Sequence, residues 1–284
     1  MTDVRGVERI LSSRPTIEGA GVNLKRAFGP AEVPMLDPFL MLDDFHSEDP
    51  RDYMAGFPWH PHRGIETVTY MIRGVVEHGD TIGNRGAINS GDVQWMTAGS
   101  GILHQEMPRE YQGLMQGFQL WVNLPASNKM MGPRYRGIVA NDIPTAKPED
   151  GVSVKIVAGR IGKTVGPVRD LVVDAQYLDV SINPRKEFVH PISSKLRAFG
   201  YIFEGSASFS GEKKNPVEPE HLVVFGDGDE VRIKAGAQGA RLLLVSGQPI
   251  REPVAWGGPI VMNTNEELSL AFDELSRGTF IKGT

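Results

Sequence analysis

The sequence predicts an all-β protein, either a sandwich or a barrel. Short runs such as ETVTYMI, SVKIVAG and HLVVF are rich in β-branched or aromatic residues and are bounded by turn residues, which is the pattern of short strands. Glycine and proline are frequent, with 33 and 20 of the 284 residues. Long stretches with helical periodicity are nearly absent, so most of the chain is expected to form many short strands.

One helix is predicted near the end of the sequence, in the segment NTNEELSLAFDELSRGTF. Thr264 and Glu267 have the spacing of a capping box, and Gly278 stands where the helix should end. Between them, apolar residues follow at helical spacing: Leu268, Ala271, Phe272 and Leu275. We expect this apolar stripe to pack on the protein's own core.

Two β domains are expected, because residues 140–151 are rich in proline and charge and have strand-like runs on both sides. We place the first domain at residues 1–140, a linker with connecting strands at 141–175, and the second domain at 176–284. The halves resemble each other most closely where residues 92–99 align with 221–228 without a gap. They are either copies of one ancestral unit or two β segments that match by chance.

Composition excludes several classes of chemistry. The chain has no cysteine, which removes disulfides, thiolate nucleophiles, iron–sulfur clusters and cysteine-bound zinc. The polar start resembles no secretory signal, and no run is long enough for a membrane helix. With a net charge of −5 and scattered lysine and arginine, nucleic acid is not expected as a partner. We therefore predict a cytoplasmic protein that binds neither nucleic acid nor membrane.

Two alternating pairs of side chains predict a metal site. In WHPHRGIET, His60 and His62 flank Pro61, and residues two apart on a strand point to the same face. Pro61 belongs on an edge strand or at a strand start. In GILHQEM, His104 and Glu106 have the same spacing. Histidine pairs of this kind also occur without metal, but two pairs on neighbouring strands would bring four ligands together.

Three imidazoles and one carboxylate with no sulfur suit Fe(II), Mn, Co, Ni, Cu or Zn. We expect one divalent ion per chain, in the first domain. At the aligned places of the second domain stand Ile233 and Ala235 instead of His104 and Glu106, and of the first pair only His190 lies nearby.

These features resemble the cupin β-barrel. More narrowly, FPWHPHRGIETVTY, HGDTIGNRGAINSGDVQWMTAGSGILHQEMP and LWVNLP together resemble the pirin family, and REPVAWGGPIVMNTNEELSLAFDELSRGTF resembles that family's C-terminal signature. The resemblance implies two tandem cupin barrels followed by a short helix. It also implies metal ligation by His60, His62, His104 and Glu106, with Fe(II) favoured. Glu66, where other cupins carry a ligand, is then expected to be structural or to support the ligands.

The resemblance further implies an iron-dependent dioxygenase of the quercetinase type, which opens a flavonol with O₂ and releases carbon monoxide. The substrate would be a small aromatic molecule, and Glu106 would be the catalytic base. The alternative is a metal- and redox-sensing interaction protein whose partner is a transcription factor or a metabolic enzyme. Isomerase or hydrolase chemistry is a third reading, because the cupin barrel hosts many reactions.

Aromatic and methionine side chains of the same segments could line an apolar pocket, although at least half should be ordinary core: Phe57, Trp59, Trp95, Met96, Met107, Met115, Phe118 and Trp121. Arg63 is expected either at the pocket rim or in solvent. His46 and His78 are expected at the surface or in hydrogen bonds rather than as ligands.

Overall fold

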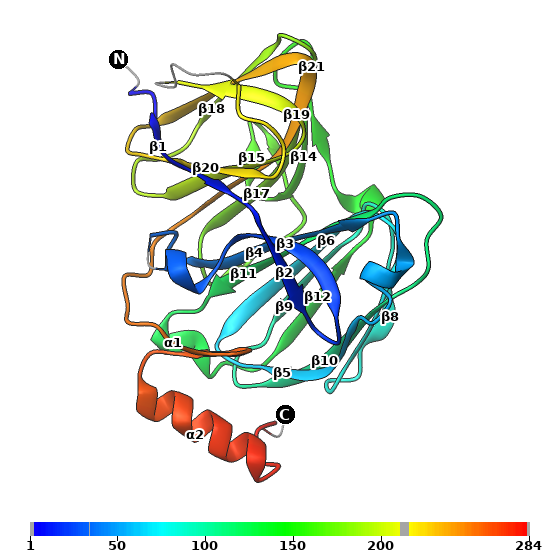
Figure 1. Cartoon of the computed structure of the whole chain (residues 1–284). Coiled ribbons are helices and arrows are strands. Elements are labelled where there is room, and N and C mark those ends of the chain that lie inside the picture. The colour runs from blue at the N-terminus through cyan, green and yellow to red at the C-terminus, as the bar shows by residue number, and fades with distance from the viewer. Residues whose placement is uncertain (1–2, 34, 211–215, 283–284) are drawn as a thin grey trace. The chain divides into compact units, whose positions relative to one another are not determined.

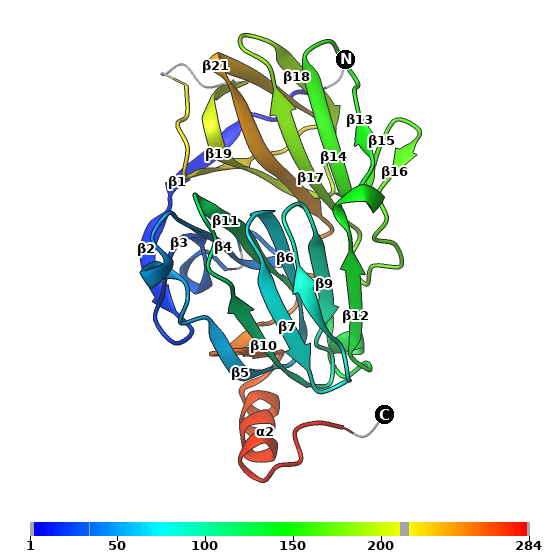
Figure 2. The same ribbon diagram turned by 90° about the vertical axis from the view of Figure 1, so that its right-hand side faces the viewer.

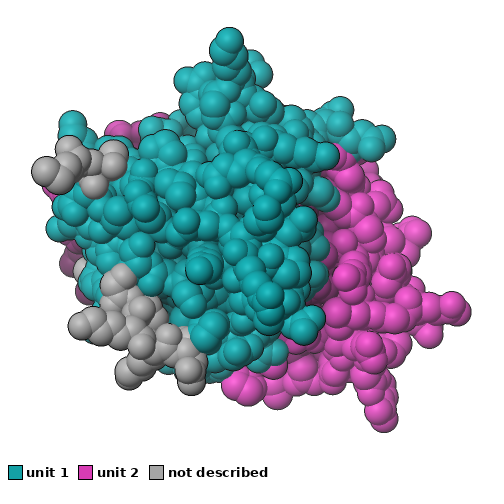
Figure 3. Space-filling view, turned by 90° about the horizontal axis from the view of Figure 1, so that it is seen from above, with its two compact units in different colours: residues 1–14, 141–249 teal, residues 15–140, 250–284 magenta. Residues whose placement is uncertain are grey.

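Strands dominate the structure, as the sequence predicted (Figure 1), and the described residues include two α-helices. The computed structural model describes residues 3–33, 35–210 and 216–282. The described residues form two compact units, coloured separately in Figure 3. Each unit is a β-sheet structure with its own apolar core.

Unit 1 is built on an eight-stranded antiparallel sheet. In hydrogen-bonded order its strands are β1 (Val7–Ser12), β20 (His221–Phe225), β19 (Arg197–Phe209), β21 (Glu230–Gly247), β17 (Ala175–Ile182), β14 (Val152–Ala158) and β13 (Thr145–Ala146), with β18 (Glu187–Pro191) also paired to β21. A short hairpin of β15 (Arg160–Ile161) and β16 (Thr164–Val165) lies outside this sheet. Alternate residues of the long strands bury one continuous core, which includes Leu178, Ile202, Val223 and Leu242.

Unit 2 has a seven-stranded and a four-stranded sheet (Figure 2). The larger sheet runs β12 (Arg134–Ile138), β9 (Val93–Thr97), β6 (Ile65–Arg73), β11 (Met115–Asn123), β4 (Phe39–Ser47), β3 (Val22–Phe28) and β2 (Arg14–Glu18). The smaller runs β5 (Phe57–His62), β10 (Ile102–Pro108), β7 (Val76–Asp80) and β8 (Arg85–Ile88). Strands β22 (Ala255–Gly257) and β23 (Ile260–Met262), helices α1 (Ala126–Lys129) and α2 (Asn265–Ser276), and 3₁₀ turns η1 (Pro30–Glu32), η2 (Pro50–Asp52) and η3 (Ala140–Asp142) complete the elements.

The units divide the chain differently from the predicted domains at both ends. Unit 1 comprises Met1–Arg14 and Asn141–Pro249, and unit 2 comprises Pro15–Ala140 and Ile250–Thr284. The first strand joins unit 1 because β1 pairs with β20. The C-terminal segment joins unit 2 because Ile260 forms a bridge with Arg63 and Val261 packs in a core cluster with Ile65. Pairing between strands far apart in sequence leaves no local trace in the sequence.

The predicted helix is confirmed as α2, and its capping box is formed. Thr264 Oγ1 accepts a hydrogen bond from the Glu267 backbone N–H, and the Glu267 carboxylate accepts one from the Thr264 N–H. Ala271 is fully buried, and Leu268 and Leu275 pack against the same small core. Among the residues described, no helix is both long and apolar enough to cross a membrane.

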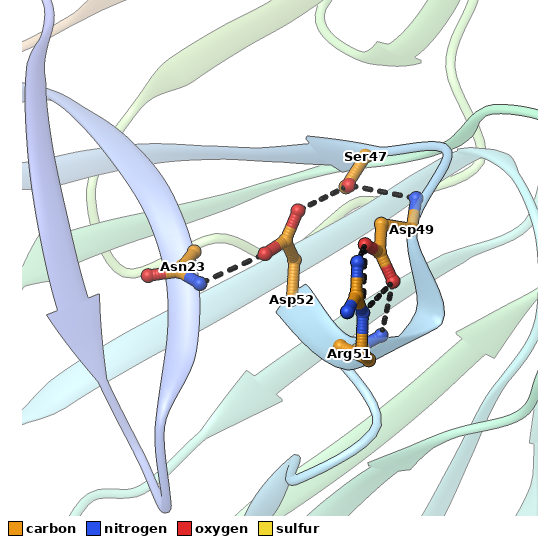
Figure 4. Close-up of polar contacts among 5 residues, drawn as sticks. All are labelled: Asn23, Ser47, Asp49, Arg51 and Asp52. Carbon is orange, nitrogen blue, oxygen red and sulfur yellow. Dashed lines mark hydrogen bonds and ion pairs between the residues drawn. The ribbon is translucent and has the colours of Figure 1, made fainter.

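A polar cluster fixes the turn that precedes β5 (Figure 4). Asp52 of η2 accepts hydrogen bonds from Asn23 of β3 at 2.9 Å and from the Ser47 hydroxyl at the end of β4. Asp49 caps η2 by accepting a hydrogen bond from the Arg51 backbone N–H. The entry to β5 is therefore tied to two strands of the larger sheet, which limits where β5 can lie.

The C-terminal segment of unit 2 passes directly over the turn after β5. Arg63 and Ile260 form a parallel bridge, and the Val261 N–H donates to the Arg63 carbonyl at 3.1 Å. Gly64 has φ of +78°, and a Cβ added to it would lie 1.9 Å from the Val261 carbonyl oxygen. Only glycine fits here, because both the backbone conformation and the space exclude a side chain.

A buried lysine joins the same segments. Lys129 Nζ donates hydrogen bonds to the carbonyl oxygens of Gly64 at 2.9 Å and Val261 at 3.0 Å, and to Asn123 Oδ1 at 2.6 Å. Burial lowers the pKa of Lys129 to about 7. The three acceptors match the three N–H bonds of the ammonium form, which favours the charged state at this position.

We predict that Gly64→Ala lowers the free energy of unfolding by about 3 kcal/mol or more, because a clash with Val261 adds to the strain of positive φ. Gly83→Ala is the matched control, since Gly83 also has positive φ but a Cβ there would contact nothing within 4 Å. The control should lose only about 1 kcal/mol. Equal losses in denaturant unfolding would contradict the steric account.

Candidate metal centre

Three histidines meet between β5 and β10, as the alternating pairs predicted. β5 is the edge strand of the smaller sheet, which suits Pro61, and it pairs antiparallel with β10. The register sets His104 directly opposite His60. One ring nitrogen from each of His60, His62 and His104 lies within 4.8 Å of the other two. The three imidazoles could therefore hold one metal ion.

Backbone acceptors fix the tautomers of the first two rings. His60 Nδ1 lies 2.9 Å from the Pro58 carbonyl oxygen, and His62 Nδ1 lies 3.1 Å from the Pro259 carbonyl oxygen. A carbonyl can only accept, so each Nδ1 carries the proton and each Nε2 keeps its lone pair. The two Nε2 atoms are 3.0 Å apart. Two lone pairs at this distance cannot hydrogen-bond to each other, whereas a shared cation satisfies both.

The third ring is buried without any hydrogen bond. His104 is fully buried, and neither of its ring nitrogens has a hydrogen-bond partner among the described residues. Burial, followed by the neighbouring His62 and His60, lowers the pKa of His104 well below its ordinary value. Burial likewise lowers the pKa of His62 to about 3. Both rings are thus held neutral, the form that binds a metal.

Glu106 lies beside this group but not within it. It shares the buried face of β10 with His104 and lines the adjoining cavity, yet it is absent from the set of atoms that lie within 4.8 Å of one another. A register shift separates His104 from Glu106 along β5, so Glu106 pairs with Phe57. Its Oε1 instead lies 2.8 Å from Thr69 Oγ1.

The hydroxyl of Thr69 connects Glu106 to a second polar group. Thr69 Oγ1 lies 2.8 Å from Glu106 Oε1 and 2.6 Å from the amide of Gln119. A hydroxyl has one proton, and an ionised carboxylate can only accept it. Thr69 therefore donates to Glu106. The structure places Gln119 Oε1 at Thr69, but this oxygen could not share the single hydroxyl proton, so we assign the amide with its N–H₂ group toward Thr69. These hydrogen bonds engage only Oε1 of Glu106 and leave Oε2 available to another partner.

Glu66 occupies a structural position, in agreement with the sequence interpretation. Its carboxylate is buried on β6 and accepts hydrogen bonds from Trp95 Nε1 at 3.0 Å and Thr97 Oγ1 at 2.6 Å. Arg63 differs from the expectation of a rim or solvent position. It is buried, and it donates to the backbone of Ser100 and Phe280 and to the Glu274 carboxylate, each at 2.7 Å.

His46 and His78 are hydrogen-bonded, as expected. His46 Nδ1 lies 2.9 Å from Asp44, and the buried His78 Nε2 lies 3.1 Å from Asp80.

A cavity of about 640 Å³ adjoins the histidines within unit 2. Its size is that of a small-molecule site. Of the aromatic and methionine residues proposed from the sequence, Phe57, Met115 and Trp121 line it. Trp95, Met96 and Phe118 are buried core residues, and Trp59 is about half exposed. The Trp121 ring meets His62 edge-on, with ring centroids 5.0 Å apart.

The polar residues of the cavity wall were not predicted from the sequence. Arg26, Asp43 and Gln119 line the cavity from β3, β4 and β11. Arg26 holds both oxygens of Asp43, at 2.8 Å each. Burial raises the pKa of Asp43 to about 6 despite this partner. Charged residues inside the apolar run FLMLDDF were the available signal.

Unit 1 has no equivalent group among its described residues. Ile233 and Ala235 belong to its apolar core. His190 is buried, stacks on Phe188, and hydrogen-bonds through Nε2 to Gln176 at 3.0 Å. In the part of the chain that the structure describes, the group of histidines that could hold a metal ion thus lies in unit 2.

The fold and the sequence together define a bicupin, a protein with two cupin barrels in one chain. Residues 21–122 match the family model Pirin, and residues 177–281 match the model of the pirin C-terminal cupin domain. The chain belongs to the pirin family.

Relatives of known name agree with this assignment. A pirin-like protein of Caulobacter vibrioides is 46% identical over 278 residues, covering 98% of this chain and 99% of that protein. Human pirin is 40% identical over 263 residues, covering 91% of this chain and 88% of human pirin. A crystal structure of quercetin 2,3-dioxygenase from Acinetobacter baumannii matches with a TM-score of 0.90 at 30% identity, covering 98% of each chain.

The buried His190 predicts a loss of stability in acid. Burial lowers its pKa to about 4 from 6.5. Between these two pH values His190 is therefore protonated in the unfolded chain and neutral in the folded chain. The folded state therefore loses up to about 3 kcal/mol as pH falls from 6.5 to 4. His190→Phe should show a shallower decline in unfolding free energy over this range. An identical slope in wild type and variant would refute the assignment.

Proposed function

We propose that this protein is a metal-dependent dioxygenase that opens a flavonol with O₂, as expected of a quercetinase-type pirin. The observation that carries the proposal is the meeting of three imidazoles, two of them with Nε2 lone pairs 3.0 Å apart, beside an aromatic-lined cavity. The similarity to a quercetin 2,3-dioxygenase over nearly the whole chain supports it.

We propose His60, His62, His104 and Glu106 as the ligands of one divalent metal ion, with Fe(II) favoured. The donor set of three imidazoles and a carboxylate suits this ion and also Mn, Co, Ni, Cu and Zn. When bound, the metal would supply Lewis acidity and the redox chemistry needed to use O₂.

Glu106 is proposed as the base that takes the proton from the flavonol's 3-hydroxyl group. Thr69 donates to its Oε1 at 2.8 Å, which aims the carboxylate and leaves Oε2 as the proton acceptor. Because it must also serve as a ligand, Glu106 needs some freedom of movement. Its position outside the tight group of histidines is consistent with that freedom.

The cavity walls position the substrate and exclude water. Trp121 and Trp256 both line the cavity, with ring centroids 5.9 Å apart. Flat indole rings offer stacking surfaces for an aromatic ligand. Other apolar residues that line the cavity, such as Met41, Val22 and Met115, disfavour water inside it, which protects reactive intermediates.

We predict that His60→Ala abolishes flavonol bleaching and O₂ uptake by protein loaded anaerobically with Fe(II), because one proposed ligand is lost. His221→Ala is the matched control: its Nδ1 also lies 2.9 Å from the carbonyl of the residue two positions earlier, Pro219, but it belongs to no metal group. Bound metal should fall from one equivalent per chain in His60→Ala only. Bleaching that persists in His60→Ala, or is absent from wild type, would contradict the proposed function.

We further predict that Thr69→Val lowers the rate of flavonol consumption by roughly 10- to 100-fold, since the hydrogen bond that aims Glu106 is removed. Thr67→Val is the control, because Thr67 lies on the same face of the same strand and its hydroxyl has no hydrogen-bond partner in the described structure. Steady-state kinetics of both variants should separate a positioning effect from simple loss of a hydroxyl. Similar rates in Thr69→Val and Thr67→Val would argue against a role of Thr69 in positioning Glu106.

The alternative of a metal- and redox-sensing interaction protein stays a prediction. Its outcome in these experiments is distinct, because such a protein would bind the metal stoichiometrically yet consume no flavonol.

A further inference from the structure

A row of polar side chains crosses the inner wall of the otherwise largely apolar cavity. The strand register sets Arg26 opposite Asp43, Asp43 opposite Gln119, and Gln119 opposite Thr69. Residues directly opposite each other across a sheet lie on the same face. All four line the cavity. The row begins at Arg26 and ends at Thr69, whose hydroxyl contacts Glu106.

The two ends of the row are separate hydrogen-bonded groups. At the end near the histidines, Gln119, Thr69 and Glu106 are linked. At the other end, Arg26 binds Asp43 through Nε and Nη2, and the same Nη2 lies 2.9 Å from Glu18. Neighbouring strands are about 4.8 Å apart, so Asp43 and Thr69 are separated by about 10 Å. A flat molecule of two or three rings spans this distance.

The charges that face the cavity favour a ligand that carries hydrogen-bond donors. Three carboxylates, Glu18, Asp43 and Glu106, face the cavity with Arg26 as the single guanidinium. The Asp43 side chain is 4% exposed, and each of its oxygens accepts one hydrogen bond from Arg26. Each oxygen keeps a second lone pair for a ligand hydroxyl. A ligand carboxylate would meet net negative charge instead.

We propose that Asp43, held by Arg26, is a specificity-determining residue that binds ring hydroxyl groups of the substrate remote from the metal, so that the cavity selects neutral polyhydroxylated aromatics over aromatic carboxylates. The inference rests on the proposed flavonol chemistry. It identifies the residue that would bind the hydroxyl groups of the distal ring, which is the flavonol ring remote from the metal. Gln119 lies midway along the row, and its amide oxygen, which in the orientation assigned above faces away from Thr69, can accept a hydrogen bond from a further ligand hydroxyl.

An equivalent triad in unit 1 provides the control. Arg241 donates to both oxygens of Asp179, at 2.9 and 2.8 Å, and also lies 3.3 Å from Glu204. Asp179 is as buried as Asp43, but it does not line this cavity. Asp43→Asn and Asp179→Asn thus remove the same kind of buried charge, and only the first should alter ligand preference.

The test measures affinities of the Fe(II)-loaded protein under anaerobic conditions by quenching of tryptophan fluorescence. Quercetin, with hydroxyls on the distal ring, is compared with 3-hydroxyflavone, which lacks them, and with a 3-hydroxyflavone that carries a distal carboxylate. Wild type should prefer quercetin to 3-hydroxyflavone by roughly tenfold or more. Asp43→Asn should lose most of this preference and gain affinity for the carboxylate, while Asp179→Asn should keep the wild-type order.

The inference would be overturned if wild type bound quercetin no more tightly than 3-hydroxyflavone. It would also be overturned if Asp43→Asn and Asp179→Asn changed the relative affinities for these ligands equally. If 3-hydroxyflavone still binds and is consumed with O₂, the proposed function survives that result. If wild type binds neither flavonol, both proposals fail.

Should Asp43→Asn not fold, Glu18→Gln replaces it, because the Glu18 side chain is 41% exposed. This variant should bind the carboxylate ligand about threefold more tightly. An unchanged affinity would also overturn the inference.

Discussion

The contact between the turn at Gly64 and strand β23 is the constraint on which the candidate site depends. The backbones approach so closely that a Cβ at Gly64 would lie 1.9 Å from the Val261 carbonyl oxygen. Lys129 Nζ donates hydrogen bonds to the carbonyl oxygens of Gly64 and Val261, and the Arg63 guanidinium donates to the Phe280 carbonyl in the segment that follows α2. This contact also brings the Pro259 carbonyl to His62 Nδ1. One ring of the proposed metal site is thus aimed by the far end of the chain.

The two units show how a small change of residue type alters what a strand pair can do. In unit 2, His104 stands on β10 opposite His60 on β5. In unit 1, β18 and β21 pair in the same antiparallel sense, and Ile233 lies opposite Phe188. Apolar side chains complete the core of unit 1, whereas in unit 2 the buried imidazoles of His62 and His104 are held uncharged by burial. A bound cation would satisfy their lone pairs and offset the cost of burying them.

Local patterns in the sequence were enough to predict the all-β fold, helix α2 and the meeting of three histidines, because strand alternation and capping are short-range effects. Long-range pairing was not predictable in this way. The assignment of the two terminal segments depends on β1 meeting β20 and on β23 meeting the turn after β5 through Arg63 and Ile260. Asp43 and Arg26 escaped notice because their partnership arises only from strand register.

The hydrogen bond between His62 and Pro259 joins residues 197 positions apart. At about 5–20 residues per second, a ribosome needs roughly 10–40 s to make the intervening chain. During that time the HPHRG segment exists without the carbonyl that orients its second histidine. Assembly of the three-histidine group is therefore delayed until Pro259 has been made, and a metal ion held by these rings would be loaded only after that point.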